Sequence, residues 1–455
     1  REMLDEAGYQ LVAVIGGYLP ATAARPDGRH WIYEFCATQQ FSGTLFYGGG
    51  IGYCAGNLAT RTIADRFANR PLVNIGCVLE QIPSVLADNF SGMKALVEHL
   101  LRKRGLRRLA FIHGPATNQE AHERFNGFKA AHERCGQRID AQLLLPGDFS
   151  PEGGRRAVQQ LLHIPTRPFD AIVCANDLTA RGVIEELRQQ GIDVPAEIAV
   201  VGFDDFEYAA ALEPPLTTVH YPAAEMGRIA ARLLLRQLDG GEVPLRTHVS
   251  SFPVLRRSSG DNGGVVSADA DSLYRDRWRQ LQLRERHANR LRFDRELFHT
   301  NELEQLFSSH GALINDAGFR QLYLCSWPEH SHNGQLWLRH AVIDGQHRPV
   351  ADEQAQIPPG HFLPAQFVTQ MALPAGASET WIVHPMACDE QPFGYLMVAA
   401  EPLVESFTES LSLQFAEALN RQRLTAATQA HRQELESSLE ALKAAYERLD
   451  KAEKI

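Results

Sequence analysis

Short, continuous apolar runs alternate with amphipathic stretches from residue 10 to about 255, and this alternation limits the folds open to the chain. The runs, in one-letter code, are YQLVAVIGG, FSGTLFYGGG, RPLVNIGC, RRLAFIHGP, AQLLLPGD, FDAIVCAND and IAVVGFDD. Strands that are apolar on both faces and separated by helices indicate parallel sheets covered on both sides. We therefore predict an α/β domain at residues 1–256, with two doubly wound lobes that face one another across a ligand cleft.

The second part of the chain has a different composition. Residues 257–270 are rich in Ser, Gly and Asp, which predicts a linker. Residues 271–298 are charged and free of Gly and Pro, and we predict a long signalling helix there. Residues 299–420 contain a helix, several apolar strands and a closing helix, an order that favours an α+β domain.

The last segment, residues 421–455, has the apolar spacing of a coiled coil. Apolar residues recur at alternating spacings of four and three at Leu435, Leu439, Leu442, Tyr446 and Leu449. This seam predicts a homodimer through coiled coils. A single amphipathic helix packed on its own domain is the alternative.

The net charge of the 455-residue chain is -10 at pH 7, which opposes attraction to a polyanion. We therefore expect no nucleic-acid binding by this region. No apolar run approaches the roughly 20 residues that span a bilayer, so we expect no membrane partner. Seven scattered cysteines without a C-x-x-C pair are typical of reduced thiols in a cytoplasmic protein.

Metal and cofactor sites are not predicted. His330 and His332 invite a metal hypothesis, but polar loop residues beside a glycine turn explain them better. Cys325 and Cys388 lie in or beside apolar strands, which favours buried structural thiols. The chain shows no nucleophile and base set, phosphate loop or metal motif, so we predict no catalytic residues, no metal and no cofactor.

Polar residues follow two of the predicted strands at their carboxyl ends, where doubly wound sheets bind ligands. Asn176 and Asp177 follow one strand, and Asp204 and Asp205 follow another. Arg124 begins a predicted helix, and its fork of donors suits vicinal hydroxyls or a carboxylate. For each residue a structural role is the alternative: a helix cap or turn for the acids, and a surface ion pair for the arginine.

Seven segments together resemble the ligand-binding core of the lactose- and purine-repressor family. They are VLADNFSG at 85–92, HGP at 113–115, ERFNGF at 123–128, GDFS at 147–150, CAND at 174–177, VVGFDD at 200–205 and PPLTTV at 214–219. The resemblance covers about 250 residues in the family's order. It implies that four residues hydrogen-bond a small-molecule effector: Asp88, Arg124, Asn176 and Asp204.

The resemblance also suggests that Phe149 stacks on the ligand, with a core position as the alternative. It leaves Asp177 and Asp205 for capping and turn structure. More weakly, residues 299–420 resemble GAF domains in their order of elements and in the strand GYLMV at 394–398. We expect this domain to be a structural or dimerising module without a tetrapyrrole or haem.

Two functions from different classes follow from these resemblances. The first is the sensory region of a signal-transduction protein, whose coiled coils pass solute binding to a missing output domain. The segment 442–454 resembles the helix before histidine-kinase dimerisation domains, and similar helices precede GGDEF diguanylate cyclases. We expect the chain to be a fragment, because its first lobe starts without its first strand and its last helix has no stop. The alternative is a ligand-responsive transcriptional regulator whose DNA-binding module lies outside this fragment.

Overall fold

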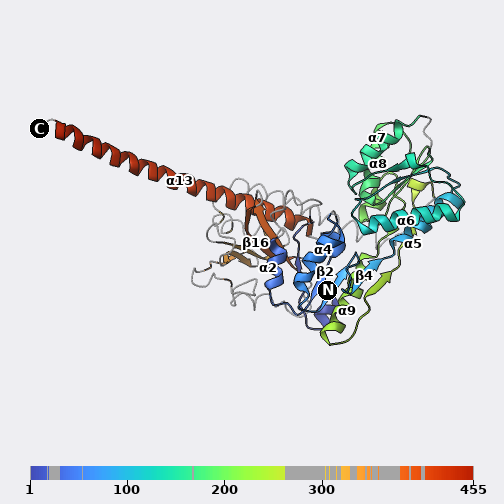
Figure 1. Cartoon of the computed structure of the whole chain (residues 1–455), viewed down its shortest axis with the longest axis horizontal. Helices are drawn as coiled ribbons and strands as arrows, with labels where there is room; N and C mark the ends of the chain where they lie inside the picture. The colour runs from blue at the N-terminus through green and yellow to red at the C-terminus, as the bar shows by residue number, and fades with distance from the viewer. Residues whose placement is uncertain are drawn as a thin grey trace. The chain divides into compact units, whose positions relative to one another are not determined.

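A computed structural model describes two compact units of the chain (Figure 1). Unit 1 comprises residues 1–10, 17–26 and 41–272, and unit 2 comprises residues 11–16, 27–40 and 273–455. The described residues are 2–17, 19, 31–53, 55–165, 169–261, 303, 307, 314, 319–327, 336–343, 346–348, 350, 357, 380–388, 391–400 and 405–453. Within these ranges, no helix combines the length and the apolar character needed to cross a bilayer.

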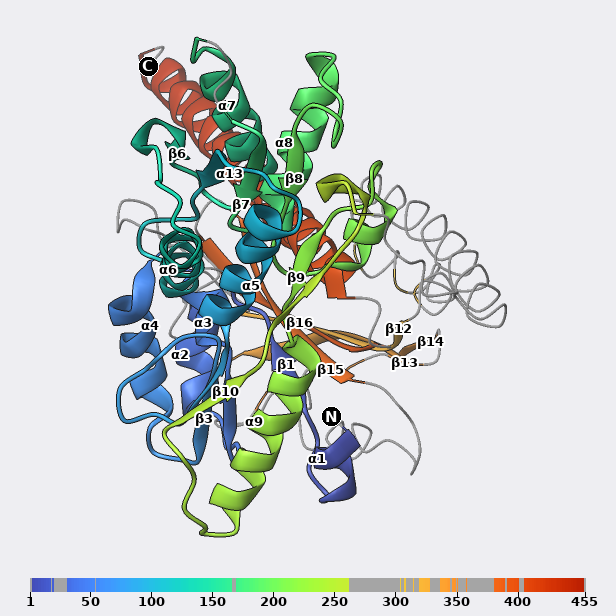
Figure 2. The same ribbon diagram turned by 90° about the vertical axis from the view of Figure 1, so that its right-hand side faces the viewer.

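Unit 1 contains two four-stranded sheets, which we name the first-lobe and second-lobe sheets (Figure 2). The first-lobe sheet has the order β10-β4-β3-β2, from strands Arg246–Val249, Ser84–Ala87, Leu72–Ile75 and Thr44–Phe46. The second-lobe sheet has the order β6-β5-β7-β8, from strands Leu144–Leu145, Leu109–Ile112, Ala171–Cys174 and Ala199–Val201. All strand pairs in both sheets are parallel, which confirms the predicted two-lobed α/β fold.

Helices connect the strands and lead the chain between the two sheets. Helix α5 (Asn89–Arg102) runs from β4 in the first-lobe sheet to β5 in the second-lobe sheet. Helix α9 (Ala223–Leu238) follows β9 (Thr218–His220) and leads back to β10. After β10, strand β11 (Phe252–Val254) pairs antiparallel with β9. The other helices of unit 1 are α1 Glu2–Glu6, α3 Gly48–Ile51, α4 Gly56–Ala64, α6 Gln119–Arg134, α7 Pro151–Leu162 and α8 Asp177–Gln189.

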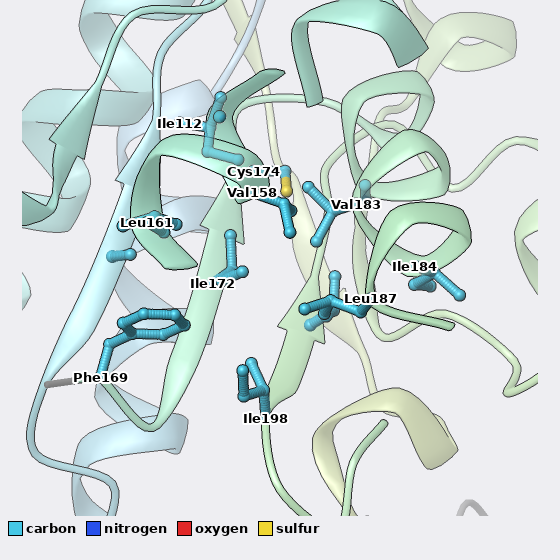
Figure 3. Close-up of a cluster of buried hydrophobic side chains, with 14 of the residues drawn as sticks. Ile112, Val158, Leu161, Phe169, Ile172, Cys174, Val183, Ile184, Leu187 and Ile198 are labelled. Atoms are coloured by element: carbon cyan, nitrogen blue, oxygen red, sulfur yellow. The ribbon is translucent and has the colours of Figure 1, made fainter. Parts of the chain in front are cut away.

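The second-lobe sheet is covered on both faces because successive side chains of a strand point to opposite sides. On β7, Ile172 and Cys174 pack with apolar residues of α7 and α8 (Figure 3). The alternate residues Ala171 and Val173 pack with apolar residues of α5 and α6 on the other face. This double burial is the physical reason for the continuous apolar runs in the sequence.

Unit 2 contains a six-stranded sheet in the order β1-β15-β16-β12-β13-β14. Its strands are β1 Val12–Val14, β12 Phe319–Ser326, β13 Trp337–Ile343, β14 Gln346–Arg348, β15 Thr380–Cys388 and β16 Gln391–Ala400. The helices of this unit whose bounds the structure describes are α2 Trp31–Thr38 and α13 Glu405–Glu453. Leu411 and Phe415 at the start of α13 pack against the apolar side chains of β12, β15 and β16.

The first apolar run departs from its predicted location in the repressor-like domain of residues 1–256. Strand β1 pairs in parallel with β15, with Val12 beside Trp381 and Val14 beside Val383. A short apolar strand leaves unpaired backbone groups, and the edge of the unit 2 sheet satisfies them. Residues 11–16 and 27–40 therefore belong to unit 2. The predicted helix at 271–298 and most of the linker lie outside the described residues.

Candidate functional site

Polar residues gather where the strands of both sheets of unit 1 end. Asp88 and Asn89 follow β4, Asn176 follows β7 and Asp204 follows β8. Arg124 lies in α6, the helix after β5. Strand-to-helix connections in doubly wound sheets bring such residues to the carboxyl edge of the sheet, where polar groups can meet a ligand.

Arg124 is the centre of this cluster, and its side chain is only 4% exposed. Its Nε donates a hydrogen bond to Asn89 Oδ1 at 2.9 Å, and its Nη1 donates to the carbonyl oxygen of Ala175 at 2.8 Å. The same Nη1 lies 3.3 Å from Asp204 Oδ1. The guanidinium stands 4.0 Å from the centre of the Phe203 ring, a cation–π arrangement. Arg124 thus connects residues that follow β4, β7 and β8.

Three carboxyl groups at this site, Glu120, Asp177 and Asp204, are buried or nearly buried, and the charge of Arg124 favours the ionised forms of Glu120 and Asp204. Burial raises the pKa of Asp204 to about 8; Arg124 opposes the rise, and the carboxyls of Asp177 and Glu120 add to it. Burial likewise raises the pKa of Asp177 to about 7, although Thr218 donates to it at 2.6 Å. Burial also raises the pKa of Glu120 against the effect of Arg124. The cluster therefore holds protons near neutral pH and can both donate hydrogen bonds to a polar ligand and accept them from it.

Asn176 and Phe149 are held by each other and by α8. The side-chain oxygen of Asn176 caps α8 by accepting from the backbone N–H of Thr179 at 3.0 Å. Its Nδ2 donates to the carbonyl oxygen of Phe149 at 3.1 Å. Phe149 is buried, has a positive φ of 63° and packs 5.2 Å from the Tyr53 ring. Both residues lie beside the cluster, and Asn176 caps a helix, a role that the sequence analysis had not given it.

Asp88 is half-buried, and its carboxylate caps α5 by accepting from the N–H of Ser91 at 2.9 Å. The neighbouring Asn89 contacts Arg124 instead, and the sequence interpretation missed it. Glu120 was also missed, although it precedes Arg124 by one helical turn and so shares its face of α6. Tyr221 Oη donates to Glu120 Oε1 at 3.0 Å and completes the cluster from the end of β9.

The capping role predicted for Asp177 belongs to Asn176, whereas Asp205 lies in a turn as predicted. Asp177 accepts from the hydroxyl of Thr218 and from the backbone N–H of Phe206, so it ties α8 to β9 and to the turn after β8. Asp205 is in the left-handed region with a φ of 59°. Within the described ranges, no group of three or more His, Cys, Asp or Glu side chains is arranged to hold a metal ion.

Comparison with known proteins identifies what this arrangement resembles. The family model of the periplasmic binding protein-like domain matches residues 97–259. The HTH-type transcriptional repressor CytR of Escherichia coli strain K12 is 30% identical over 260 residues, which cover 55% of this chain and 73% of that repressor. The chain belongs to the LacI family.

Two further proteins show the same similarity. The ribose operon repressor of Escherichia coli strain K12 is 36% identical over 180 residues, 39% of this chain and 54% of that protein. Among solved structures, the Escherichia coli transcriptional repressor ascG has 24% identity and a TM-score of 0.47, and the match covers 56% of this chain and 90% of that chain.

Membership of the LacI family corrects the first functional hypothesis. The prediction of a sensory region for a histidine kinase or diguanylate cyclase is wrong, because the relatives are transcriptional repressors. The heptad spacing near residue 442 had suggested a signalling helix, but such spacing carries no information about what a helix is attached to. The expectation that this region has no nucleic-acid partner is also in doubt, since these relatives bind DNA.

The raised carboxyl pKa values predict how stability depends on pH in this LacI-family domain. Asp204 and Asp177 keep their protons in the folded state up to about pH 8 and 7, whereas the usual value of 3.8 applies after unfolding. Between the unfolded and the folded pKa values the folded state therefore binds more protons than the unfolded state, so stability falls as the pH rises and the loss is complete above the folded values. We expect the free energy of unfolding, measured in urea, to fall from about pH 4 to about pH 8 and to level off above that.

The Asp204→Asn variant is the control for this pH dependence, because an amide has no proton to lose. Its free energy of unfolding should fall less steeply over the same range. An identical slope in the parent and in the variant would show that Asp204 does not titrate there.

Proposed function

We propose that unit 1 binds a small polar effector at the Arg124 cluster and that the chain is part of a cytoplasmic, ligand-responsive transcriptional regulator of the LacI family. The observation that carries this proposal is the buried Arg124 guanidinium, which joins Asn89 after β4 to Asp204 after β8. A buried charge that contacts segments of both lobes can change its contacts when a molecule binds between those segments.

The effector should be a sugar or a nucleobase-like molecule. Carboxyl groups near their pKa can pair with hydroxyls or amines, and the guanidinium can donate to vicinal oxygens. An anionic effector is disfavoured, because Glu120, Asp177 and Asp204 outnumber the one buried arginine. The ribose operon repressor among the relatives suggests D-ribose as a first compound to test.

The proposed ligand contacts are the five residues predicted from the sequence together with two from the structure. Arg124 and Asp204 are proposed as direct partners, and Asn89 and Glu120 join them because they contact Arg124. Three residues are proposed at the edge of the site on the resemblance alone: Asp88, Phe149 and Asn176.

For unit 2 we propose a GAF-like domain whose exit helix forms a parallel coiled-coil dimer. The antiparallel strands β12 to β16 and the long α13 support this proposal. Leu435, Leu439 and Leu442 on α13 are 60%, 52% and 68% exposed, at spacings of four and three. Large apolar side chains in this register are typical of a helix that pairs with a second copy of itself.

Removing either direct partner should weaken effector binding. An isothermal titration should show Arg124→Ala and Asp204→Ala binding more weakly by about 2 to 5 kcal/mol, because each removes one partner of a buried hydrogen-bonded contact at the proposed site. The effector is first found by thermal shift against D-ribose, other sugars, nucleosides and nucleobases. Arg156→Ala is the matched control, since Arg156 pairs with Asp148 at the surface of α7. Parent affinity in both site variants would exclude the Arg124 cluster as the binding site.

The regulator assignment is tested with the intact protein purified from its source cells. We expect it to retain specific DNA fragments, identified by sequencing, and to retain more or fewer of them when the effector is added. This change follows because a ligand with different affinities for two states shifts their populations. If the protein retains no specific fragment with or without effector, the assignment fails.

The dimer proposal predicts that charges in the α13 seam will separate the subunits. The parent chain should sediment as a dimer, and Leu435→Asp combined with Leu442→Asp should sediment as a monomer, because four like charges would meet in the seam. Leu424→Asp is the control, since Leu424 is exposed but lies outside the heptad register. A monomeric parent, or a dimer that survives the double substitution, would contradict the coiled coil.

A further inference from the structure

The chain leaves the second lobe through a short segment that is attached to the effector site. We name Arg256–Asp261 the exit segment, and Gly202–Asp205 the Asp204 turn. The Nη2 of Arg256 donates to Asp205 Oδ1 at 2.7 Å, and its Nη1 donates to the carbonyl oxygen of Leu216 at 2.9 Å. The Arg256 side chain is 20% exposed, so this ion pair is largely shielded from water.

The Asp204 turn needs external support, because two of its residues have unfavourable backbone angles. Asp204 has a φ of 129° and Asp205 has a φ of 59°, both rare for residues with a side chain. Such angles persist only when surrounding contacts determine them. Asp205 receives two such contacts, from Arg256 and from His220, whose Nδ1 lies 3.2 Å from Asp205 Oδ2. His220 is 40% exposed and is therefore the weaker of the two.

The backbone of Arg256 and of the residues that follow it is held by hydrogen bonds to neighbouring elements. The backbone N–H of Arg256 donates to the hydroxyl of Thr217, which donates to the carbonyl oxygen of Arg256. Farther along, Ser258 donates to the carbonyl oxygen of Val200 on β8. Asp261 accepts from Ser259 and lies 3.0 Å from Nε2 of His99 on α5. The exit segment is thus tied to β8, β9 and α5.

We propose that Arg256 is a positioning residue that holds the Asp204 turn, so that the Asp204 carboxylate faces Arg124. This inference rests on the proposed function of the Arg124 cluster, which it deepens. Asp205 connects Arg256 to Asp204. Arg256 holds the carboxylate of Asp205 in place, and the backbone of Asp205 then limits the conformation of the preceding residue, Asp204. Because the contact is reciprocal, an effector that displaces Asp204 also acts on the exit segment, from which the chain continues to residue 262 and beyond.

The test measures amide hydrogen exchange in the whole chain without any ligand. Three amides report on the turn, because Asp204 N–H donates to Val219, Phe206 N–H to Asp177 and Tyr221 N–H to Asp204. In Arg256→Ala these amides should exchange about tenfold faster, as expected for the loss of roughly one charged hydrogen bond. The matched control is Arg257→Ala, since Arg257 is 59% exposed and pairs with the exposed Glu213.

Two further variants separate positioning from a general loss of stability. Arg256→Lys keeps the charge with a single donor group and should restore part of the protection. Asp205→Asn removes the acceptor charge from the other end and should reproduce the faster exchange, even if Arg256→Ala fails to fold. Unchanged exchange in Arg256→Ala, or equal acceleration in Arg257→Ala, would overturn the proposal. Because no ligand is used, a failed effector screen would not affect this result.

Discussion

The guanidinium of Arg124 is buried where water cannot solvate it, and the rest of the site is arranged to satisfy it. It has hydrogen-bond acceptors on Asn89 and Ala175, and the carboxyl group of Asp204 lies beside it. Leaving such a charge without partners would cost about 3 to 5 kcal/mol, a large part of the stability of a typical domain. The segments after β4, β7 and β8 are therefore held at fixed positions around one side chain, and this explains why strand ends from both lobes meet there.

The same burial has an electrostatic consequence for the acids. One guanidinium cannot neutralise Glu120, Asp177 and Asp204 together, and burial raises the free energy of their ionised forms. Protonation resolves the conflict, and the pKa values of Asp177 and Asp204 rise to about 7 and 8. A carboxyl group of this kind can donate a hydrogen bond while it is protonated and accept one after it ionises. It can therefore adjust its protonation state to the hydroxyl groups of a bound molecule.

Much of the fold follows from local sequence patterns, and the remainder depends on distant partners. The apolar runs predicted β2, β3 and β5 to β8, because strands buried on both faces need continuous apolar residues. The run at β1 was equally clear, but its partner β15 lies more than 300 residues away, and periodicity does not select a partner. Strand β9 contains Thr218 and His220, and β11 contains Pro253, so neither has the continuous apolar sequence that marks the other strands.

The candidate site shows the same division. The family resemblance named Arg124 and Asp204, and the structure brings them within 3.3 Å. It named Asp88 rather than Asn89, because two short polar residues at the start of a helix are equivalent in sequence: one caps the helix and the other turns inward. Tyr221 was missed because it reaches Glu120 from a segment 101 residues away.

The hydrogen bonds that Arg124 forms within the protein also affect how an effector could act. The guanidinium of Arg124 already contacts Asn89, Ala175 and Asp204. A ligand that replaces these contacts gains affinity only to the extent that its own contacts with Arg124 are stronger than the ones that are lost. That difference favours molecules with several hydroxyls in fixed geometry over small single-contact solutes. The exchange also loosens the link between the segment after β4 and the segment after β8. Binding and the release of an internal contact between lobes would then be the same event, which is the property that a ligand-controlled regulator requires.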